Sequence, residues 1–255
     1  MSEARRRLLL LVPPRSYRSG AFTTVAKELG IEVVYGVDMP PALAELYRVP
    51  LPLDFTDIER STAAVLRSLA DQPPLDGLLA VDDSGTLLAA HIGQALGLPH
   101  NAPLAAEAAR NKHLMRRTLS EAGLSQPWFR YIPADASLPN LADRLTYPLV
   151  VKPLLLSGSR GVMRADAPAE FIAAGERLRA MLPRHGPDDA RAILAEGYLP
   201  GDEIALDGLL NDGDLHLLAI FDKPDPLVGP FFEETVFTTP SRLSADTQGR
   251  RGEEA

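Results

Sequence analysis

Short apolar runs alternate with helix-like segments over the first hundred residues of the chain. Each run has the length of a buried strand, and the segments between them repeat apolar residues at helical spacing. Because strands separated by single helices connect through right-handed crossovers, the pattern predicts a parallel sheet flanked by helices. The predicted strands are Leu8–Val12, Ile31–Tyr35, Leu51–Phe55 and Leu75–Val81, and the predicted helices cover residues 21–29, 57–70 and a segment that starts after Ser84.

Start and stop signals flank these helices. Thr56 and Glu59 have the spacing of a capping box at the start of the second helix. Ser84 is the predicted N-cap of the third helix. Gly30 follows the first helix, at the position where glycine commonly ends a helix.

The pattern changes near residue 100. Two helices are predicted over residues 101–110 and 112–122, and the chain becomes strand-like after Pro127. A domain boundary is therefore expected near residues 100–110. The predicted strands beyond it are Trp128–Ile132, Tyr147–Lys152, Arg160–Arg164, Ala192–Glu196, Glu203–Leu210 and Leu215–Phe221, with one helix over residues 168–182.

Composition excludes several classes of protein. The chain has 255 residues, of which 45% are hydrophobic and 24% charged, so it is not disordered, collagenous or a coiled coil as a whole. Its net charge of −8 argues against a nucleic-acid binder. The absence of cysteine excludes disulfides, thiolate metal sites and cysteine nucleophiles. The histidines, at positions 91, 100, 113, 185 and 216, have no ligand spacing, so a structural zinc site is not expected.

No stretch of the sequence approaches the roughly 18 apolar residues that a membrane-spanning helix needs. The apolar run Leu8–Val12 follows three arginines, but it is too short for the apolar region of a signal peptide. We therefore expect a cytoplasmic protein that has no membrane partner.

Lysine is rare in this chain, which draws attention to Lys27, Lys112, Lys152 and Lys223. Lys152 ends a β-branched strand, and a small, glycine-rich segment follows. Backbone N–H groups in such a segment can approach phosphate oxygens without obstruction by Cβ atoms. A β-hairpin with a polar tip is the alternative interpretation, and the segment is not a Walker A motif. Its candidate phosphate-binding residues are Ser157, Gly158, Ser159, Arg160 and Gly161.

A second candidate segment runs from Glu196 to Glu203. It begins with an acid at the end of a strand and has a second acid seven positions later, a pattern that suits a nucleotide hinge. Backbone groups near Tyr198 and Leu199 would pair with an adenine edge, and Glu203 would accept hydrogen bonds from ribose hydroxyls. A turn with two solvated carboxylates is the alternative, just as Lys112 by itself is compatible with a solvated surface lysine.

Together these segments occur in one order: Asn111-Lys112, Val151-Lys152-Pro153, the small-residue loop, and Glu196 to Glu203. With this order the chain resembles the ATP-grasp superfamily, and within it the carboxylate–amine ligases of the D-alanine and L-amino-acid type. The resemblance covers nearly the whole chain. It implies an α/β fold class, with a Rossmann-like pre-ATP-grasp domain containing a parallel sheet over residues 1–104, an incomplete α+β ATP-grasp domain over residues 105–240, and a polar tail over residues 241–255.

The resemblance also implies a role for each candidate residue. Lys112 and Lys152 would bind the ATP phosphates, and the loop Ser157–Val162 would close over the triphosphate and exclude water. Glu196 would lie near the adenine amino group, with Tyr198 and Leu199 beside the base and Glu203 on the ribose. Lys223, in a later loop, would contact the γ-phosphate. Glu233 and Glu234 would face either a substrate amine or water.

By the same resemblance, ATP would phosphorylate a small carboxylate substrate. An amine would then attack the acyl phosphate, giving an amide, ADP and phosphate, and amino acids are the candidate substrates. Stabilising the charge of the transferred phosphoryl group is the main task in such a reaction. Family members are often dimers, so a homodimer is compatible with the resemblance.

The sequence departs from the family pattern at its end. The family's Mg²⁺ ligands include a late Glu-x-Asn pair, and Ser241–Ala255 contains none, so the resemblance implies Mg²⁺ without identifying its ligands or any catalytic residue. We expect a chain truncated at the C-terminus, with an unpaired sheet edge and exposed apolar surface. A catalytically inactive ATP-binding or interaction module is thus an alternative to a ligase. A Rossmann-type oxidoreductase is a third possibility, but no Gly-x-Gly-x-x-Gly follows Leu8–Val12.

Overall fold

The chain is divided into an N-terminal unit, Met1–Asn111, and a C-terminal unit, Lys112–Ala255. The computed structural model describes residues 5–14, 16–183, 190–211, 213–225, 228–232, 236–244 and 247. Within that part of the chain, no helix is both long and apolar enough to cross a bilayer.

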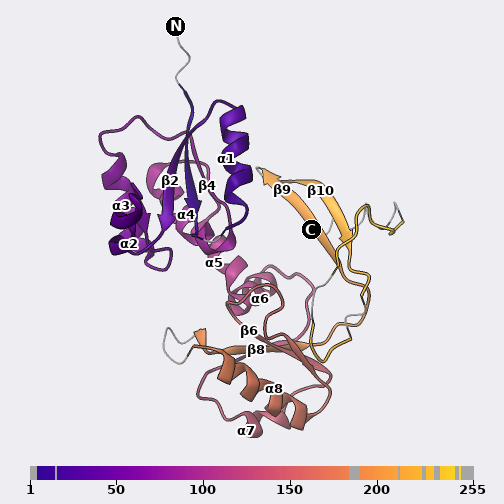
Figure 1. The fold of residues 1–255 in the computed structure, drawn as a ribbon. Coiled ribbons are helices and arrows are strands. Elements are labelled where there is room, and N and C mark those ends of the chain that lie inside the picture. Colours follow the sequence, from indigo (N-terminus) through magenta and orange to yellow (C-terminus); the bar gives the residue numbers. More distant parts are fainter. Residues whose placement is uncertain are drawn as a thin grey trace. The chain divides into compact units, whose positions relative to one another are not determined.

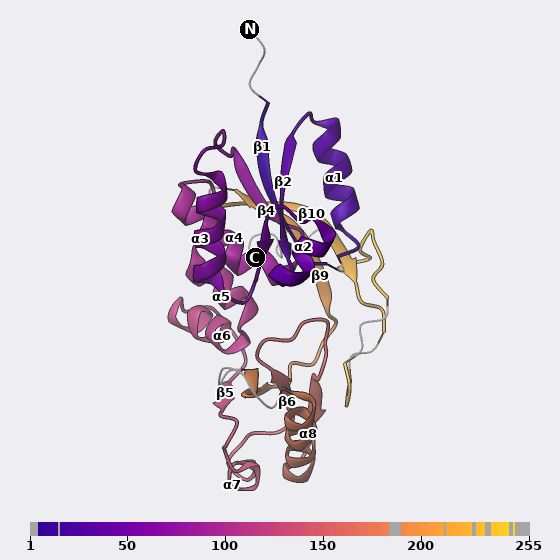
Figure 2. The same cartoon turned by 60° about the vertical axis from the view of Figure 1, so that its left-hand side comes forward.

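A parallel four-stranded sheet forms the centre of the N-terminal unit (Figure 1). Its strand order is β3-β2-β1-β4, and β1 pairs in parallel with both β2 and β4. Figure 2 shows α1 on one side of these strands and α3 and α4 on the other. The strands are β1 (Arg7–Val12), β2 (Glu32–Asp38), β3 (Pro52–Leu53) and β4 (Gly77–Ala80), and the helices are α1 (Ser19–Glu28), α2 (Pro41–Tyr47), α3 (Ile58–Leu69), α4 (Thr86–Leu96) and α5 (Pro103–Arg110).

The core of this unit lies between the sheet and helices α3 and α4. Leu9 and Leu11 of β1 are fully buried together with Val65 of α3 and Ile92 of α4. Leu10, whose side chain points to the opposite face, is also fully buried. Burial on both faces explains why β1 appears in the sequence as a continuous apolar run rather than an alternating one.

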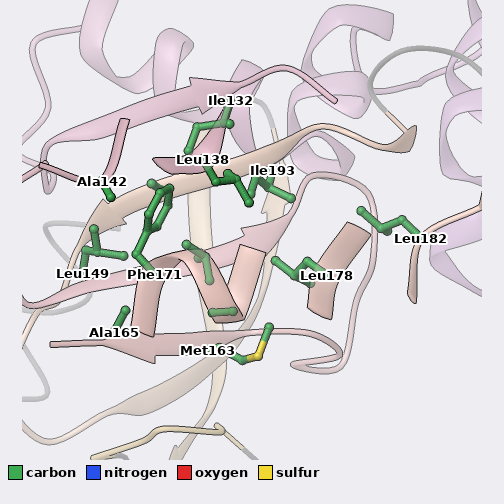
Figure 3. Packing of buried hydrophobic residues seen from close by; sticks show 13 residues of the cluster. Ile132, Leu138, Ala142, Leu149, Met163, Ala165, Phe171, Leu178, Leu182 and Ile193 are labelled. Atoms are coloured by element: carbon green, nitrogen blue, oxygen red, sulfur yellow. The ribbon is translucent and has the colours of Figure 1, made fainter. Parts of the chain in front are cut away.

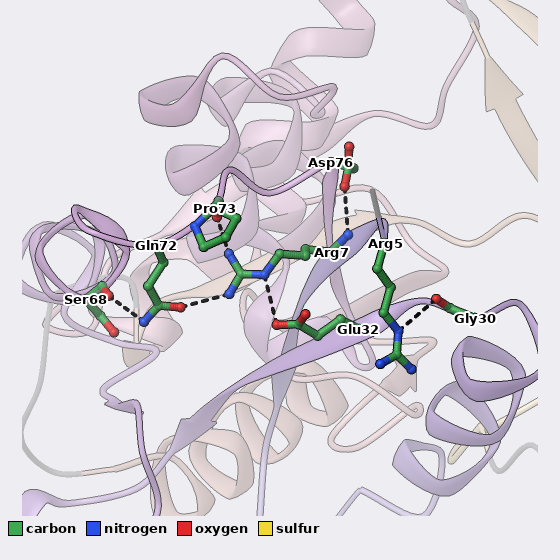
Figure 4. Close-up of polar contacts among 8 residues, drawn as sticks. All are labelled: Arg5, Arg7, Gly30, Glu32, Ser68, Gln72, Pro73 and Asp76. Carbon is green, nitrogen blue, oxygen red and sulfur yellow. Dashed lines mark hydrogen bonds and ion pairs between the residues drawn. The ribbon is translucent and has the colours of Figure 1, made fainter. Parts of the chain in front are cut away.

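Arg7 attaches the first strand to its surroundings (Figure 4). Its guanidinium donates to Glu32 at 2.9 Å, to Gln72 at 2.8 Å and to the carbonyl of Pro73, and its backbone N–H donates to Asp76 at 2.7 Å. The side chain is only 7% exposed. Because every one of these bonds joins β1 to β2 or to the turn before β4, Arg7 has a structural role.

The cap predicted for α3 is wrong by one residue. Asp57, not Thr56, is the N-cap, and its carboxylate accepts a hydrogen bond from the backbone N–H of Arg60 at 3.0 Å. Thr56 uses its hydroxyl as a donor to Asp54 at 2.6 Å, so the capping box with Glu59 does not form.

The cap predicted for α4 is also wrong. A 3₁₀ turn, η1 (Asp83–Gly85), precedes the helix, and Asp82 caps that turn by accepting from the Ser84 N–H at 3.0 Å. In neither place does the predicted hydroxyl residue provide the cap: Asp57, one residue after Thr56, caps α3, and Asp82, two residues before Ser84, caps the 3₁₀ turn that precedes α4.

The C-terminal unit contains an antiparallel four-stranded sheet and a separate two-stranded hairpin. The strand order of the larger sheet is β5-β8-β6-β7. The strands are β5 (Phe129–Ile132), β6 (Leu149–Pro153), β7 (Met163–Ala165), β8 (Ile193–Gly197), β9 (Ile204–Asn211) and β10 (Asp214–Asp222), and the helices are α6 (Lys112–Glu121), α7 (Leu138–Ala142) and α8 (Pro168–Met181).

Helix α8 covers one face of the larger sheet (Figure 3). Phe171 and Leu178 on the helix and Ile193 on β8 are all fully buried in one cluster. At Gly175 a Cβ atom would lie 2.7 Å from Leu138 of α7. The glycine therefore lets the two helices approach closely.

These elements confirm the predicted fold class, a Rossmann-like parallel sheet followed by an α+β arrangement. Two short helices, α2 and α7, were not predicted. The hairpin carries apolar side chains that are largely exposed: Leu209 is 61% exposed, Leu210 72% and Leu218 65%.

Candidate functional site

Strands β6 and β8 bring Lys152 and Glu196 together. The strands are antiparallel, with Val150 opposite Glu196 and Lys152 opposite Leu194. Lys152 and Glu196 are therefore diagonal neighbours on one face of the sheet. Their side chains form an ion pair in which the lysine is 18% and the glutamate 8% exposed.

Helix α6 supplies a second cation to the same carboxylate. Arg116 Nε lies 3.0 Å from Glu196 Oε2, whereas Lys152 binds Oε1, so each carboxylate oxygen has its own partner. Arg116 is 17% exposed. It stands one helical turn after Lys112, and the i,i+4 spacing places both side chains on one face of α6.

Lys112 begins α6 next to the end of β6. Its backbone N–H donates to the carbonyl of Leu154 at 3.2 Å, and its ammonium donates to the carbonyls of Leu154 at 3.4 Å and Leu156 at 2.5 Å. Burial lowers the pKa of Lys112 from its ordinary value, the Lys152 ammonium lowers it further, and the Glu196 carboxylate opposes both effects.

We call Lys112, Arg116, Lys152 and Glu196 the cation cluster. It combines three cationic side chains with one carboxylate. Because positive charge is in excess and the groups are largely removed from solvent, the cluster favours an anionic ligand. Lysine and arginine side chains are the residues that commonly bind phosphate.

The glycine-rich loop joins β6 to β7, so the two strands form an antiparallel hairpin as the alternative interpretation of this segment requires. Three residues have backbone φ in the left-handed region: Gly158 at +63°, Ser159 at +52° and Gly161 at +77°. The Arg160 Nε donates to the carbonyl of Ser157 at 3.1 Å. Ser157, Gly158 and Arg160 are exposed, so the hairpin tip is open to solvent.

The segment after β8 leaves the sheet at Gly197. The N–H of Gly197 donates to the carbonyl of Trp128 at 2.9 Å, and the N–H of Tyr198 donates to the carbonyl of Pro148 at 3.2 Å. These bonds hold the segment against the sheet up to Tyr198. Leu199, the next residue, is 67% exposed.

Glu203 and Lys223 lie together at the base of the β9–β10 hairpin. Their side chains form an ion pair, and the Lys223 N–H donates to the Glu203 carbonyl at 3.3 Å. The Lys223 side chain is 10% exposed and its ammonium lies 5.3 Å from the centre of the Phe237 ring. The family resemblance implies contacts of Glu203 with the ribose and of Lys223 with the γ-phosphate, and in the structure the two side chains are paired with each other.

Two residues near these segments, Arg116 and Arg164, were not predicted from the sequence. Arg116 has a recognisable signal, because it stands four residues after Lys112 on a predicted helix. Arg164 has none. Its guanidinium lies 4.2 Å from the centre of the Tyr198 ring and donates to the Val228 carbonyl at 2.9 Å. Arg164 therefore connects β7 with the segment after β8 and with the segment after Lys223.

A protein-held metal site is not found in the part of the chain that the structure describes. There, no group of three or more His, Asp or Glu side chains is arranged to hold an ion. Glu233 and Glu234, predicted to face an amine or water, lie outside the described residues, as does most of the polar tail.

Two protein families match separate parts of this chain. The family of ATP-grasp N-terminal domains matches residues 23–100, and the family of ATP-grasp domains matches residues 145–253. The crystal structure of an L-amino acid ligase from Bacillus licheniformis superposes with a TM-score of 0.78 at 28% sequence identity, covering 98% of this chain and 60% of the ligase. The chain belongs to the ATP-grasp family.

Two curated relatives of this ATP-grasp chain are similar over most of its length. The ATP-grasp enzyme fsqD of Aspergillus fumigatus is 29% identical over 240 residues, which are 86% of this chain and 38% of fsqD. An alanine–anticapsin ligase of Bacillus subtilis is 30% identical over 194 residues, which are 68% of this chain and 40% of that ligase. The ATP-grasp chain thus spans about two fifths of the length of these relatives.

Proposed function

We propose that the C-terminal unit binds ATP and that the cation cluster receives the phosphates. The single observation that carries this proposal is the excess of positive charge around Glu196 in a protein of the ATP-grasp family. Lys112 and Lys152 would bind the phosphate oxygens. Lys112 is suited to this role because a phosphate would offset the burial that now disfavours its charged form.

The remaining nucleotide contacts are proposed from the resemblance to ATP-grasp ligases. The exposed backbone near Leu199 would pair with the adenine edge beside Tyr198, with Glu196 on the amino group of the base. Glu203 would accept hydrogen bonds from the ribose, and Lys223 would leave Glu203 to contact the γ-phosphate. The loop of Ser157, Gly158, Ser159, Arg160 and Gly161, whose tip is exposed, would close over the triphosphate, where its backbone N–H groups become donors.

The proposed reaction is ATP-dependent joining of a small carboxylate to an amine, with amino acids as the candidate substrates. A carboxylate oxygen attacks the γ-phosphorus and ADP leaves. The amine nitrogen then attacks the acyl carbon, phosphate leaves with the former carboxylate oxygen, and an amide forms after loss of a proton. The support is the ligase relatives, whose names specify alanine–anticapsin and L-amino acid ligases.

The cationic side chains would contribute by stabilising charge on the transferred phosphoryl group. ATP-grasp ligases generally use Mg²⁺ with ATP, and a bound Mg²⁺ would offset further phosphate charge. The second candidate function is an inactive ATP-binding or interaction module, which uses the same cation cluster without turnover. A homodimer is proposed for either function.

ATP binding by the 255-residue chain tests the first step. We expect ATP to raise the thermal unfolding temperature, and we expect Lys152→Met to reduce that rise by weakening ATP binding about tenfold or more. Arg117→Met is the matched control, because Arg117 neighbours the cluster on α6 but is 56% exposed and pairs with Glu121. The absence of any ATP response in the unmodified chain contradicts the proposal.

ADP release in the presence of ATP, Mg²⁺ and a panel of amino acids separates the two candidate functions. Sustained release that depends on an added amino acid and is lost in Lys152→Met supports the ligase. ATP binding without amino-acid-dependent release supports the inactive module.

A further inference from the structure

Glu196 is held by two cations at once, and this arrangement bears on how ATP would reach Lys152. One carboxylate oxygen binds Lys152 and the other binds Arg116 at 3.0 Å. All three side chains are mostly buried, with exposures of 18%, 17% and 8% for Lys152, Arg116 and Glu196. The ion pairs are therefore poorly screened by solvent.

A Lys152 ammonium that binds a nucleotide phosphate has to weaken its pairing with Glu196. If Glu196 had no other partner, this transfer would leave a buried carboxylate without a counter-charge, which is strongly unfavourable. Arg116 removes that penalty because it binds the other carboxylate oxygen. Lys112 is less suited to the task, since its ammonium already donates to the carbonyls of Leu154 and Leu156.

We propose that Arg116 is a positioning residue. It keeps the Glu196 carboxylate paired with a positive charge and in place while the Lys152 ammonium moves from Glu196 to a phosphate of the nucleotide. This inference rests on the proposed binding of ATP. An arginine suits the role because its charge is permanent and its planar guanidinium holds a carboxylate in a defined direction. Arg116 itself need not touch the nucleotide.

Without Arg116, the ion pair between Lys152 and Glu196 should become harder to break. We expect Arg116→Met to weaken binding of ATP and of inorganic tripolyphosphate about tenfold, because Lys152 becomes the main partner of a buried carboxylate. Tripolyphosphate has no base or ribose, so it reports on the phosphate contacts alone. Arg117→Met, on the exposed side of the same helix, should bind both ligands as the unmodified chain does.

The decisive variant combines Arg116→Met with Glu196→Gln. A neutral amide no longer holds the Lys152 ammonium, so tripolyphosphate affinity should return to within about threefold of the unmodified chain. A purely structural role of Arg116, or a direct contact between Arg116 and phosphate, predicts no such recovery. If Arg116→Met does not fold, Arg116→Lys replaces it in the experiment. Arg116→Lys should lose less tripolyphosphate affinity, and adding Glu196→Gln should restore that affinity in the same way.

The outcomes separate this inference from the proposed function. If the unmodified chain binds neither ATP nor tripolyphosphate in calorimetry, both proposals fail. If it binds them and Arg116→Met binds equally well, or the double variant is no better than the single one, only the role of Arg116 is overturned. If tripolyphosphate affinity falls in Arg116→Met and recovers when Glu196→Gln is added, the positioning role of Arg116 is supported.

Discussion

Gly161, at the end of the glycine-rich loop, combines a left-handed backbone with close contacts for an added methyl group. Its φ of +77° lies in the left-handed region, which costs a residue with a Cβ atom about 1–2 kcal/mol. The added Cβ would also lie 2.6 Å from Leu178 Cδ2 and 2.5 Å from Met181 Cε.

The two contacts differ in how easily they are relieved. Met181 is half exposed and its methyl group can move away, whereas Leu178, on the sheet-facing side of α8, is fully buried in the core. Overpacking against a buried side chain costs about 1–3 kcal/mol. Together with the backbone term, Gly161→Ala should lower the free energy of unfolding of the C-terminal unit by about 2–5 kcal/mol.

Gly158→Ala is the matched control. Gly158 has a similar φ of +63°, but a Cβ there would meet no atom within 4 Å. Gly158→Ala should therefore lower the free energy of unfolding only by the cost of the left-handed backbone, about 1–2 kcal/mol. The comparison of the two variants isolates the steric contact with Leu178.

Urea unfolding followed by tryptophan fluorescence measures both variants. The chain has one tryptophan, Trp128, and its carbonyl accepts a hydrogen bond from Gly197 in the same unit, so its emission reports on the C-terminal unit. A midpoint for Gly161→Ala that is no lower than that for Gly158→Ala would refute the steric reasoning.

Three further predictions concern other parts of the chain. Asp57→Ala should lower the free energy of unfolding of the N-terminal unit by about 1 kcal/mol, because Asp57 caps α3, and Thr56→Ala should lower it by less. Thermal unfolding followed by circular dichroism compares the two variants, and equal losses would contradict the assignment of Asp57 as the cap. Phe171→Ala should lower the free energy of unfolding of the C-terminal unit by about 3–5 kcal/mol in the urea assay, since Phe171 is fully buried between α8 and the sheet, and a loss no larger than that of a surface substitution would contradict its place in the core. The pKa of Lys112 is lowered from 10.5, so Lys112 loses its proton at a lower pH than a solvated lysine, and ATP affinity measured by calorimetry should fall as the pH rises toward 10.5. The lowered pKa also makes Lys112 unfavourable for folding. This destabilisation is complete below the pKa of Lys112 in the folded state and disappears as the pH rises to its pKa in the unfolded state. Lys112→Arg should flatten this pH dependence of ATP affinity, and an unchanged slope would point to another group.

Much of the architecture could be predicted from the sequence because strand formation here follows local patterns. The run Leu8–Val12 is apolar throughout and becomes β1, which is buried on both faces. The rare lysines at positions 112 and 152 likewise drew attention to the cation cluster. Helix caps were less predictable, since Asp57 and Thr56 are adjacent acceptors and only the folded backbone selects one of them.

The sequence by itself determined most of the order of strands and helices, without α2 and α7, together with the ATP-grasp resemblance and three of the four members of the cation cluster. Only the tertiary structure decided which charges meet. Arg116, Lys152 and Glu196 are far apart along the chain, and they become neighbours because β6 pairs with β8 and α6 begins beside the end of β6. Ion pairing depends on distance and burial in three dimensions, and neither quantity is present in a residue pattern read along the chain.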